Sequence, residues 1–184
     1  EMADLCYGAF DVADKYRTPT MLLGDGAIGQ MMEPVVLPEP KGELPEKPWA
    51  TSGHKNKRAH NIMDSLYLTA EELEDLNVAR FERYQSILRD EQRAELFMTD
   101  DADIVLAAYG ASLWPFPTDA FEQVMSHAKL FLTVEMSMGQ MVDDVRLASA
   151  GRVPVEFFGR TGGIIPTPVE VLARIEELSG KVGA

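Results

Sequence analysis

Apolar residues near the start of the chain recur every three or four positions, which is the spacing of one face of an α-helix. They are Met2, Leu5, Ala9, Val12, Ala13 and Tyr16. The pattern predicts a helix from about residue 2 to 16, which ends before Pro19 because proline disfavours helical geometry at the residue before it. The run from Thr20 to Leu23 predicts a short buried strand that ends at the glycine-rich turn beginning with Gly24.

A polar middle section separates this start from the rest of the chain. Prolines 34, 38, 40, 45 and 48 lie among Glu and Lys residues, so residues 36–48 are predicted to form an extended connector. Thr69 followed by Glu72 matches a capping box, in which each side chain satisfies a backbone donor near the other residue. It predicts a long polar helix over about residues 70–97, whose charges are most simply a solvated face.

The last part of the chain alternates strand and helix patterns. Strands are predicted at residues 104–109, 130–134 and 153–158. Helices are predicted at about 118–127, at 139–148 and after Thr167–Pro168, where proline occupies the first helical turn and its missing N–H costs least. This alternation predicts an α/β fold with a parallel sheet.

Charge and cysteine content narrow the possible partners. The chain has 184 residues, 46% of them hydrophobic, and a net charge of −13, which argues against nucleic acid or an anionic membrane as a partner. No apolar run reaches the ~20 residues of a membrane span, and the single cysteine suits a reducing cytoplasm. A cysteine-ligated iron–sulfur cluster needs about four thiolates, so Cys6 alone cannot hold one. The chain begins at Glu1 without a clear helix cap, and we expect it to be a piece of a longer protein.

Residues 24–30 contain the spacing G-x-G-x-x-G. Gly24, Asp25, Gly26 and Gly29 make the pattern, and Gln30 follows it. A dinucleotide site requires an acidic residue about 20 positions later, at the end of a second strand, and here that distance falls in the proline-rich connector. The pattern therefore favours a tight turn, in which glycine supplies backbone freedom, over a nucleotide site.

Metal ligands and nucleophiles are not evident in the sequence. Asp100, Asp101 and Asp103 are not followed by the further loop ligands of a calcium site. The histidines at positions 54, 60 and 127 lack the spacing of zinc or nucleophile motifs. We therefore predict no metal site and assign no catalytic residue.

The segment from Glu135 to Gln140 lies where a strand meets a helix. Ligands and partners of an open parallel sheet gather at the carboxyl ends of its strands, where Gly139 allows close backbone approach and Gln140 is a possible donor to a carbonyl or phosphate. Methionines 136, 138 and 141 also suit a packed corner, because methionine fills irregular gaps. Both interpretations remain open, with the packed corner slightly favoured.

A second candidate follows the last predicted strand. Arg160 and Thr161 precede Gly162 and Gly163, and a guanidinium beside flexible backbone suits an anionic group or a partner's carboxylate. A glycine-rich turn with a solvated arginine is the structural alternative, and the residue pattern favours it slightly.

Taken in order, these segments resemble the α subunit of 2-oxoacid:ferredoxin oxidoreductases. The segments that carry the resemblance are residues 9–17, 23–34, 101–105, 113–117, 134–146, 155–163 and 166–168. Asn61 to Leu68 is most similar to the branched-chain form, which acts on 2-ketoisovalerate (3-methyl-2-oxobutanoate). The resemblance covers nearly the whole chain, and its specificity comes from the combination of segments.

The resemblance implies an enzyme complex that decarboxylates a 2-oxoacid on thiamine diphosphate with Mg²⁺. The complex passes electrons through iron–sulfur clusters to ferredoxin and releases an acyl-CoA. Its partners would be the β, γ and ferredoxin-like subunits, and a second α chain. The chain itself is expected to hold none of the cofactors. The alternatives are the α subunit of a 2-oxoglutarate or pyruvate enzyme of the same family, or a non-catalytic module that docks other subunits.

The resemblance also implies a domain plan. Residues 1–37 would end a pyrimidine-binding domain, residues 38–98 would form the connector and long helix, and residues 99–184 would form a three-layer, transketolase-C-terminal-like domain. The family runs from a segment like Tyr109–Gly110 through a helix and a strand before one like Ser112–Pro117. Here Gly110 is followed directly by Ala111, so we expect about 25 to 30 residues, the size of a crossover unit, to be absent at this junction. Either the protein has a real deletion there, or the sequence joins two segments across a gap, and we favour the gap.

Overall fold

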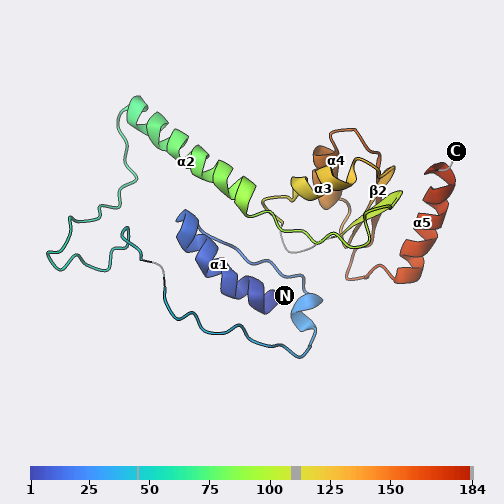
Figure 1. Ribbon diagram of the computed structural model, residues 1–184, viewed down its shortest axis with the longest axis horizontal. Coiled ribbons are helices and arrows are strands. Elements are labelled where there is room, and N and C mark those ends of the chain that lie inside the picture. Colours follow the sequence, from blue (N-terminus) through green and yellow to red (C-terminus); the bar gives the residue numbers. More distant parts are fainter. Residues whose placement is uncertain (45, 109–112, 183–184) are drawn as a thin grey trace. The chain divides into compact units, whose positions relative to one another are not determined.

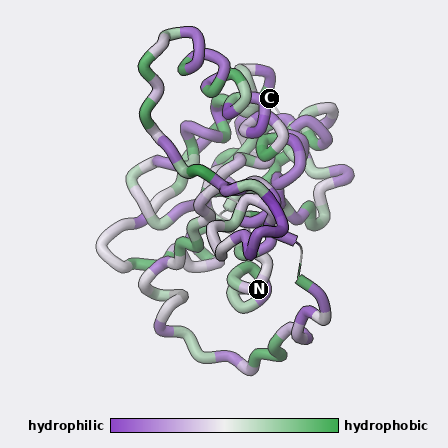
Figure 2. The backbone as a smooth tube through the Cα atoms, turned by 90° about the vertical axis from the view of Figure 1, so that its left-hand side faces the viewer, coloured by the Kyte–Doolittle hydropathy of each residue, from purple (hydrophilic) through white to green (hydrophobic). Residues whose placement is uncertain are grey.

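The computed structural model describes residues 1–44, 46–108 and 113–182. The chain divides into two compact units, Glu1–Ser86 and Ile87–Ala184 (Figure 1). Hydrophobic residues occur along the loops as well as in the helices and strands (Figure 2). Within the described ranges, none of the helices is both long and apolar enough to cross a membrane.

The first helix of the first unit confirms the prediction from apolar spacing. Helix α1 spans Met2–Tyr16 and ends at Arg17, whose φ of 50° is the left-handed conformation common at helix ends. Lys41 and Lys47 of the connector form ion pairs with Asp11 and Asp14 of α1, at 2.5 and 2.6 Å. These pairs tie the extended connector to the helix.

The predicted strand at residues 20–23 is wrong. These residues have no regular structure, and Met21, Leu22 and Leu23 are exposed. A strand needs a neighbour for its N–H and C=O groups, and the described part of the first unit contains no strand that could pair with them. The chain continues instead into one turn of 3-10 helix, η1, at Ile28–Gln30.

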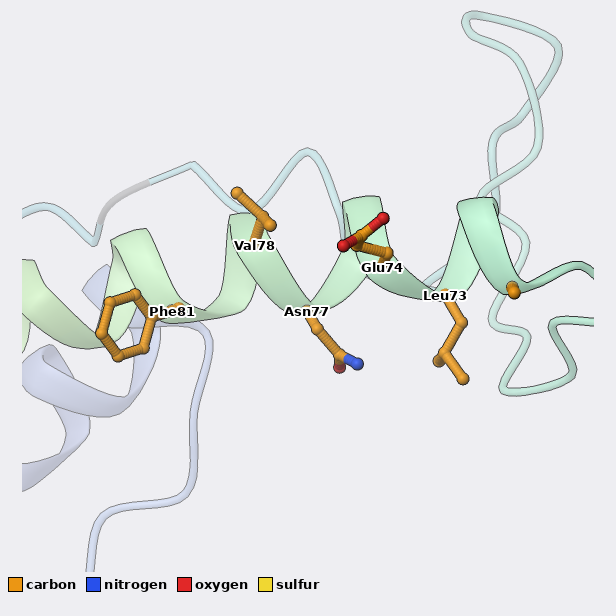
Figure 3. Close-up of a pocket in the computed structure, with 6 residues that line it drawn as sticks. Leu73, Glu74, Asn77, Val78 and Phe81 are labelled. Atoms are coloured by element: carbon orange, nitrogen blue, oxygen red, sulfur yellow. The ribbon is translucent and has the colours of Figure 1, made fainter.

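Helix α2 spans Ala70–Asp90 and has no buried residue. Thr69 caps it as predicted, since Thr69 Oγ1 accepts from the N–H of Glu72 at 3.4 Å, but the helix ends at Asp90 rather than near residue 97. A shallow hollow on its surface is lined by Ala70, Leu73, Glu74, Asn77, Val78 and Phe81. These side chains all come from α2 and point in different directions (Figure 3), so they do not converge on a ligand.

The second unit is the predicted α/β fold with a parallel sheet. Strands β1 (Ile104–Ala108), β2 (Leu130–Glu135) and β3 (Val155–Gly159) pair in the order β1-β2-β3. Helix α3 (Thr118–Val124) connects β1 to β2, α4 (Met141–Ser149) connects β2 to β3, and α5 (Pro168–Val182) follows β3. The predicted break between Gly110 and Ala111 lies outside the described residues.

Helices cover both faces of this sheet and make three layers (Figure 1). On one face, Phe131 and Val105 pack with Val124 of α3 and Val145 of α4. On the other, Leu130 and Leu132 pack against Leu178 of α5. The sheet is buried on both sides at β2, as parallel sheets are, and this rigid centre positions the loops at its carboxyl edge.

Candidate functional site

The two candidate loops of the second unit leave the same edge of the sheet. Glu135, the last residue of β2, pairs with Gly159, the last residue of β3. The backbone N–H of Arg160 donates to the backbone oxygen of Glu135 at 3.1 Å. The structure therefore brings the start of the segment Glu135–Gln140 beside the start of Arg160–Gly163, at the edge where open parallel sheets bind ligands.

The side chain of Glu135 caps helix α4. Only 4% of the residue is exposed. Its Oε2 accepts hydrogen bonds from the N–H groups of Gln140 (3.0 Å) and Met141 (3.1 Å), and its Oε1 accepts from Val142 N–H (3.2 Å). These are N–H groups that the first turn of a helix leaves without intrahelical partners. The carboxylate thus fills the place where a bound anion would otherwise lie.

Ser137 completes the cap. Its hydroxyl donates to Oε2 of Glu135 at 2.7 Å and accepts from the N–H of Gly139 at 3.1 Å. Burial alone would raise the pKa of Glu135, but the hydrogen bonds from Ser137 and from the three backbone N–H groups outweigh burial and lower the pKa. Glu135 is therefore held as a carboxylate, as a helix N-terminus favours.

Two glycines allow the loops to pack this closely. Gly139 has a φ of 108°, which L side chains rarely adopt. At Gly159 a Cβ atom would lie only 2.4 Å from the backbone oxygen of Ser137. The sequence pointed to Gly139 but not to Gly159 or Ser137, because close approach between two loops leaves no mark in local spacing.

Arg160 is engaged by its own chain. Its guanidinium contacts Oε1 of Glu170 at 2.6 Å. The other oxygen of Glu170 accepts from the N–H and the hydroxyl of Thr167, both at 2.9 Å, and the Thr167 hydroxyl accepts from the N–H of Glu170 at 3.3 Å. Hydrogen bonds from Thr167 and, to a lesser extent, the charge of Arg160 lower the pKa of Glu170. This reciprocal capping box fixes the start of α5.

The tips of the same two loops are exposed. Met138 is 83% exposed, and Gln140, Thr161, Gly162 and Gly163 also lie at the surface. Gly162 and Gly163 have φ values of 67° and 83°, as the predicted glycine-rich turn requires. They lead to Ile164 and Ile165, which are both exposed. The carboxyl edge therefore presents apolar side chains beside few free polar groups.

The glycine motif of the first unit forms a local turn. Asp25 Oδ1 accepts from the N–H of Ala27 at 2.7 Å, and the N–H of Gly29 donates to the backbone oxygen of Asp25 at 2.9 Å. Gln30 ends η1. No strand leads into Gly24 or Gly26 in the described chain, so the strand–turn–helix context that a dinucleotide motif requires is not formed there.

The sequence is similar to a known family domain and to two ketoisovalerate oxidoreductase subunits. Residues 102–171 match the pyruvate:ferredoxin oxidoreductase core domain II family. The chain is 37% identical to the ketoisovalerate oxidoreductase subunit VorB of Methanothermobacter thermautotrophicus, over 98% of the chain and 58% of that protein. It is 35% identical to VorB of Methanothermobacter marburgensis, with the same coverage.

A more distant similarity concerns another subunit type. The 2-oxoglutarate synthase subunit KorA of Methanothermobacter thermautotrophicus is 25% identical, over 97% of the chain and 61% of that protein. The chain thus spans about 58% of the length of the VorB relatives. The alignment with VorB of Methanothermobacter thermautotrophicus runs over 206 positions, whereas the chain has 184 residues. At least 22 positions of that alignment therefore have no residue of this chain.

Proposed function

The chain is a homologue of the ketoisovalerate oxidoreductase subunit VorB and carries core domain II of the pyruvate:ferredoxin oxidoreductases, and on this premise we propose that it is part of the α subunit of a 2-oxoacid:ferredoxin oxidoreductase. The complete complex would convert 2-ketoisovalerate, coenzyme A and oxidised ferredoxin to an acyl-CoA, CO₂ and reduced ferredoxin. The observation that carries the proposal is the identity of 37% over 98% of the chain.

The choice of 2-ketoisovalerate rests on which relatives are more similar. The two VorB subunits are 37% and 35% identical to the chain, whereas the KorA subunit of Methanothermobacter thermautotrophicus is 25% identical. 2-Oxoglutarate is the second candidate substrate, and pyruvate the third. Comparing kcat/KM for these three 2-oxoacids in the complete complex tests the choice, and a preference for 2-oxoglutarate or pyruvate would overturn it.

Thiamine diphosphate, when bound in such a complex, supplies the carbanion chemistry, and iron–sulfur clusters carry the electrons. The described residues do not fit either group. The carboxylate of Glu135 is taken up by the N-terminus of α4, and Arg160 is paired with Glu170. Cys6 is exposed and is the single cysteine of the chain, and no cluster of three or more His, Cys, Asp or Glu in the described ranges could hold a metal ion. We therefore derive no reaction step from these residues.

We propose instead that this part of the subunit docks other subunits of the complex, or a second α chain, through the carboxyl edge of the sheet. Met138 follows β2, and Ile164 and Ile165 follow β3, and all three are exposed. Exposed apolar residues that gather at one edge are typical of protein–protein contacts. The caps made by Glu135 and Glu170 support this role, because they hold both loops in place without a ligand.

Charged substitutions at this edge test the docking role in the complete complex. We expect Met138→Glu and Ile165→Glu to release partner subunits on a sizing column, with ferredoxin reduction falling in parallel. Leu147→Glu is the matched control, since Leu147 is 77% exposed on α4 away from the edge. Loss of turnover with assembly intact, for these variants or for Gln140→Ala, would assign the edge to chemistry, and effects no larger than that of the control would exclude an interface.

A further inference from the structure

One face of helix α1 is covered by two short pieces of chain in and just after the connector. The α1 residues that touch these pieces are three or four positions apart, so they share one face of the helix: Tyr7, Asp11, Asp14 and Arg17. Their partners follow in the same order along the chain and are Glu39, Lys41, Lys47 and Trp49. The two pieces, residues 39–41 and 47–49, therefore run parallel to α1 (Figure 1), and we call them the latch.

Lys41 makes the most contacts in the latch. Its ammonium group lies 2.5 Å from Oδ2 of Asp11 and 4.2 Å from the ring centroid of Tyr7, and it donates to the backbone oxygen of Tyr7 at 3.4 Å. The Tyr7 hydroxyl in turn donates to the backbone oxygen of Glu39 at 2.6 Å. Only 24% of the Lys41 side chain is exposed, which is little for a lysine. Helix α1 thus offers this lysine a carboxylate, an aromatic face and a backbone acceptor at once.

The second piece of the latch uses the same chemistry further along α1. Lys47 pairs with Asp14 at 2.6 Å, and the guanidinium of Arg17 lies 5.3 Å from the ring centroid of Trp49. These contacts are polar, whereas Leu44, which lies between the two pieces in the sequence, is 73% exposed. The latch is therefore held by charge and hydrogen bonds and not by burial of apolar side chains. Ion pairs near the surface are weak and are screened by salt, so the latch can be released.

We infer that this face of α1 is a docking site for an extended, lysine-bearing segment of another protein chain, and that the latch occupies the site when no such partner is bound. Asp11 and Asp14 lie one turn apart, with the ring of Tyr7 one turn before them, so the site attracts two lysines and repels an acidic segment. A covalently linked segment competes at an effective concentration in the millimolar range, so a partner segment binds measurably only when the latch is released. Nothing in this inference depends on the reaction proposed above.

The first measurement tests whether the latch lies on α1 in solution. Cys6 of α1 is exposed and is the single cysteine of the chain, so a nitroxide attached to it should broaden the backbone amide NMR signals of the latch at low salt. In 1 M NaCl, where the Debye length falls to about 3 Å, the broadening should decrease by roughly threefold or more. The double variant Lys41→Glu/Lys47→Glu, in which glutamates face the two aspartates, should lose the broadening at low salt as well.

Two further variants separate docking from a general effect of charge. Lys55→Glu/Lys57→Glu is the matched control, because both lysines are exposed and lie outside the latch, and it should leave the broadening unchanged. Adding Asp11→Lys and Asp14→Lys to the double variant exchanges the charges of both ion pairs, and this should restore the broadening.

The second measurement tests the docking site with a synthetic peptide that has the sequence of residues 38–50. The peptide should bind to the Lys41→Glu/Lys47→Glu chain with a Kd at least tenfold lower than to the unaltered chain, whose latch occupies the site. The same peptide with both lysines replaced by glutamate should not bind. Equal affinity for the two chains, or no binding to the double variant, would overturn the inference, and so would broadening that survives the double substitution.

A reciprocal variant covers the case in which the double variant does not fold, as judged by circular dichroism. Asp11→Lys/Asp14→Lys also releases the latch, because its lysines then face lysines. This chain should bind the glutamate form of the peptide at least tenfold more tightly than the lysine form, and the absence of such a preference would overturn the inference.

Discussion

Replacing Glu135 with glutamine tests whether its carboxylate holds the corner together. Glutamine keeps the length of the side chain, but it removes the charge and turns one acceptor oxygen into an NH₂ group. In the wild type this carboxylate accepts from Ser137, Gln140, Met141 and Val142. A glutamine can therefore no longer serve all four donors, and at least one of them loses its partner at a buried position.

The expected cost follows from these contacts. Loss of an N-cap costs about 0.5–2 kcal/mol, and a buried donor left without a partner costs about 1–3 kcal/mol. We therefore expect Glu135→Gln to lower the free energy of unfolding by about 2–4 kcal/mol, measured by urea denaturation at pH 7. Glu176→Gln is the control: Glu176 is exposed on α5, and its replacement should change the free energy by no more than about 0.5 kcal/mol.

The pH dependence gives a second, independent readout. The pKa of Glu135 is lowered in the folded state, so its ionisation stabilises the fold above the ordinary glutamate pKa of about 4.3, and this contribution is lost as the pH falls through the folded pKa. The difference in free energy between wild type and Glu135→Gln should thus be largest near pH 7 and should narrow as the pH falls below about 5. A difference below about 0.5 kcal/mol at pH 7, or one that does not change with pH, would refute the capping role.

Two further predictions concern packing in the same unit, and both are checked by urea denaturation. Gly159→Ala should destabilise the fold by about 1–3 kcal/mol, because its Cβ would meet the backbone oxygen of Ser137 at 2.4 Å. The control Gly180→Ala in α5, where a Cβ would have nothing within 4 Å, should be neutral or stabilise the fold by up to about 1 kcal/mol. Equal effects of the two substitutions would contradict this account of the loop contact. Thr133→Val should be neutral or stabilising, because the buried Thr133 hydroxyl has no partner among the described residues, and a loss above about 1 kcal/mol would show that the hydroxyl is satisfied.

Local sequence patterns predicted most of the helices and strands and their order. The predictions were wrong or imprecise where tertiary contacts decide whether a segment forms a strand or where a helix ends. Helix α1, the capped start of α2 and the three parallel strands follow from spacing and capping alone. The strand at residues 20–23 was wrong because apolar composition says nothing about whether a pairing partner exists. The predicted end of α2 was too late. The helical spacing of apolar and polar residues continues to about Phe97, but the helix ends at Asp90.

In the candidate site, too, the sequence predicted where residues lie but not which contacts they make. Sequence reasoning found Glu135, Gly139 and Arg160 as residues at strand ends, and the structure places all three at the carboxyl edge. It could not assign their bonds, because Glu135 caps a helix that begins six residues later, at Met141, and Arg160 pairs with Glu170 across a loop. A carboxylate at a strand end, shortly before a helix, is the sequence signal that could have suggested the cap.

The strand order explains why the loops that follow β2 and β3 make structural contacts and do not bind a ligand. In open α/β sheets, ligands bind where the strand order reverses, and the described order β1-β2-β3 contains no reversal. The caps made by Glu135 and Glu170 hold these two loops in place without a ligand. We therefore expect the edge at β2 and β3 to be available for contact with another protein chain.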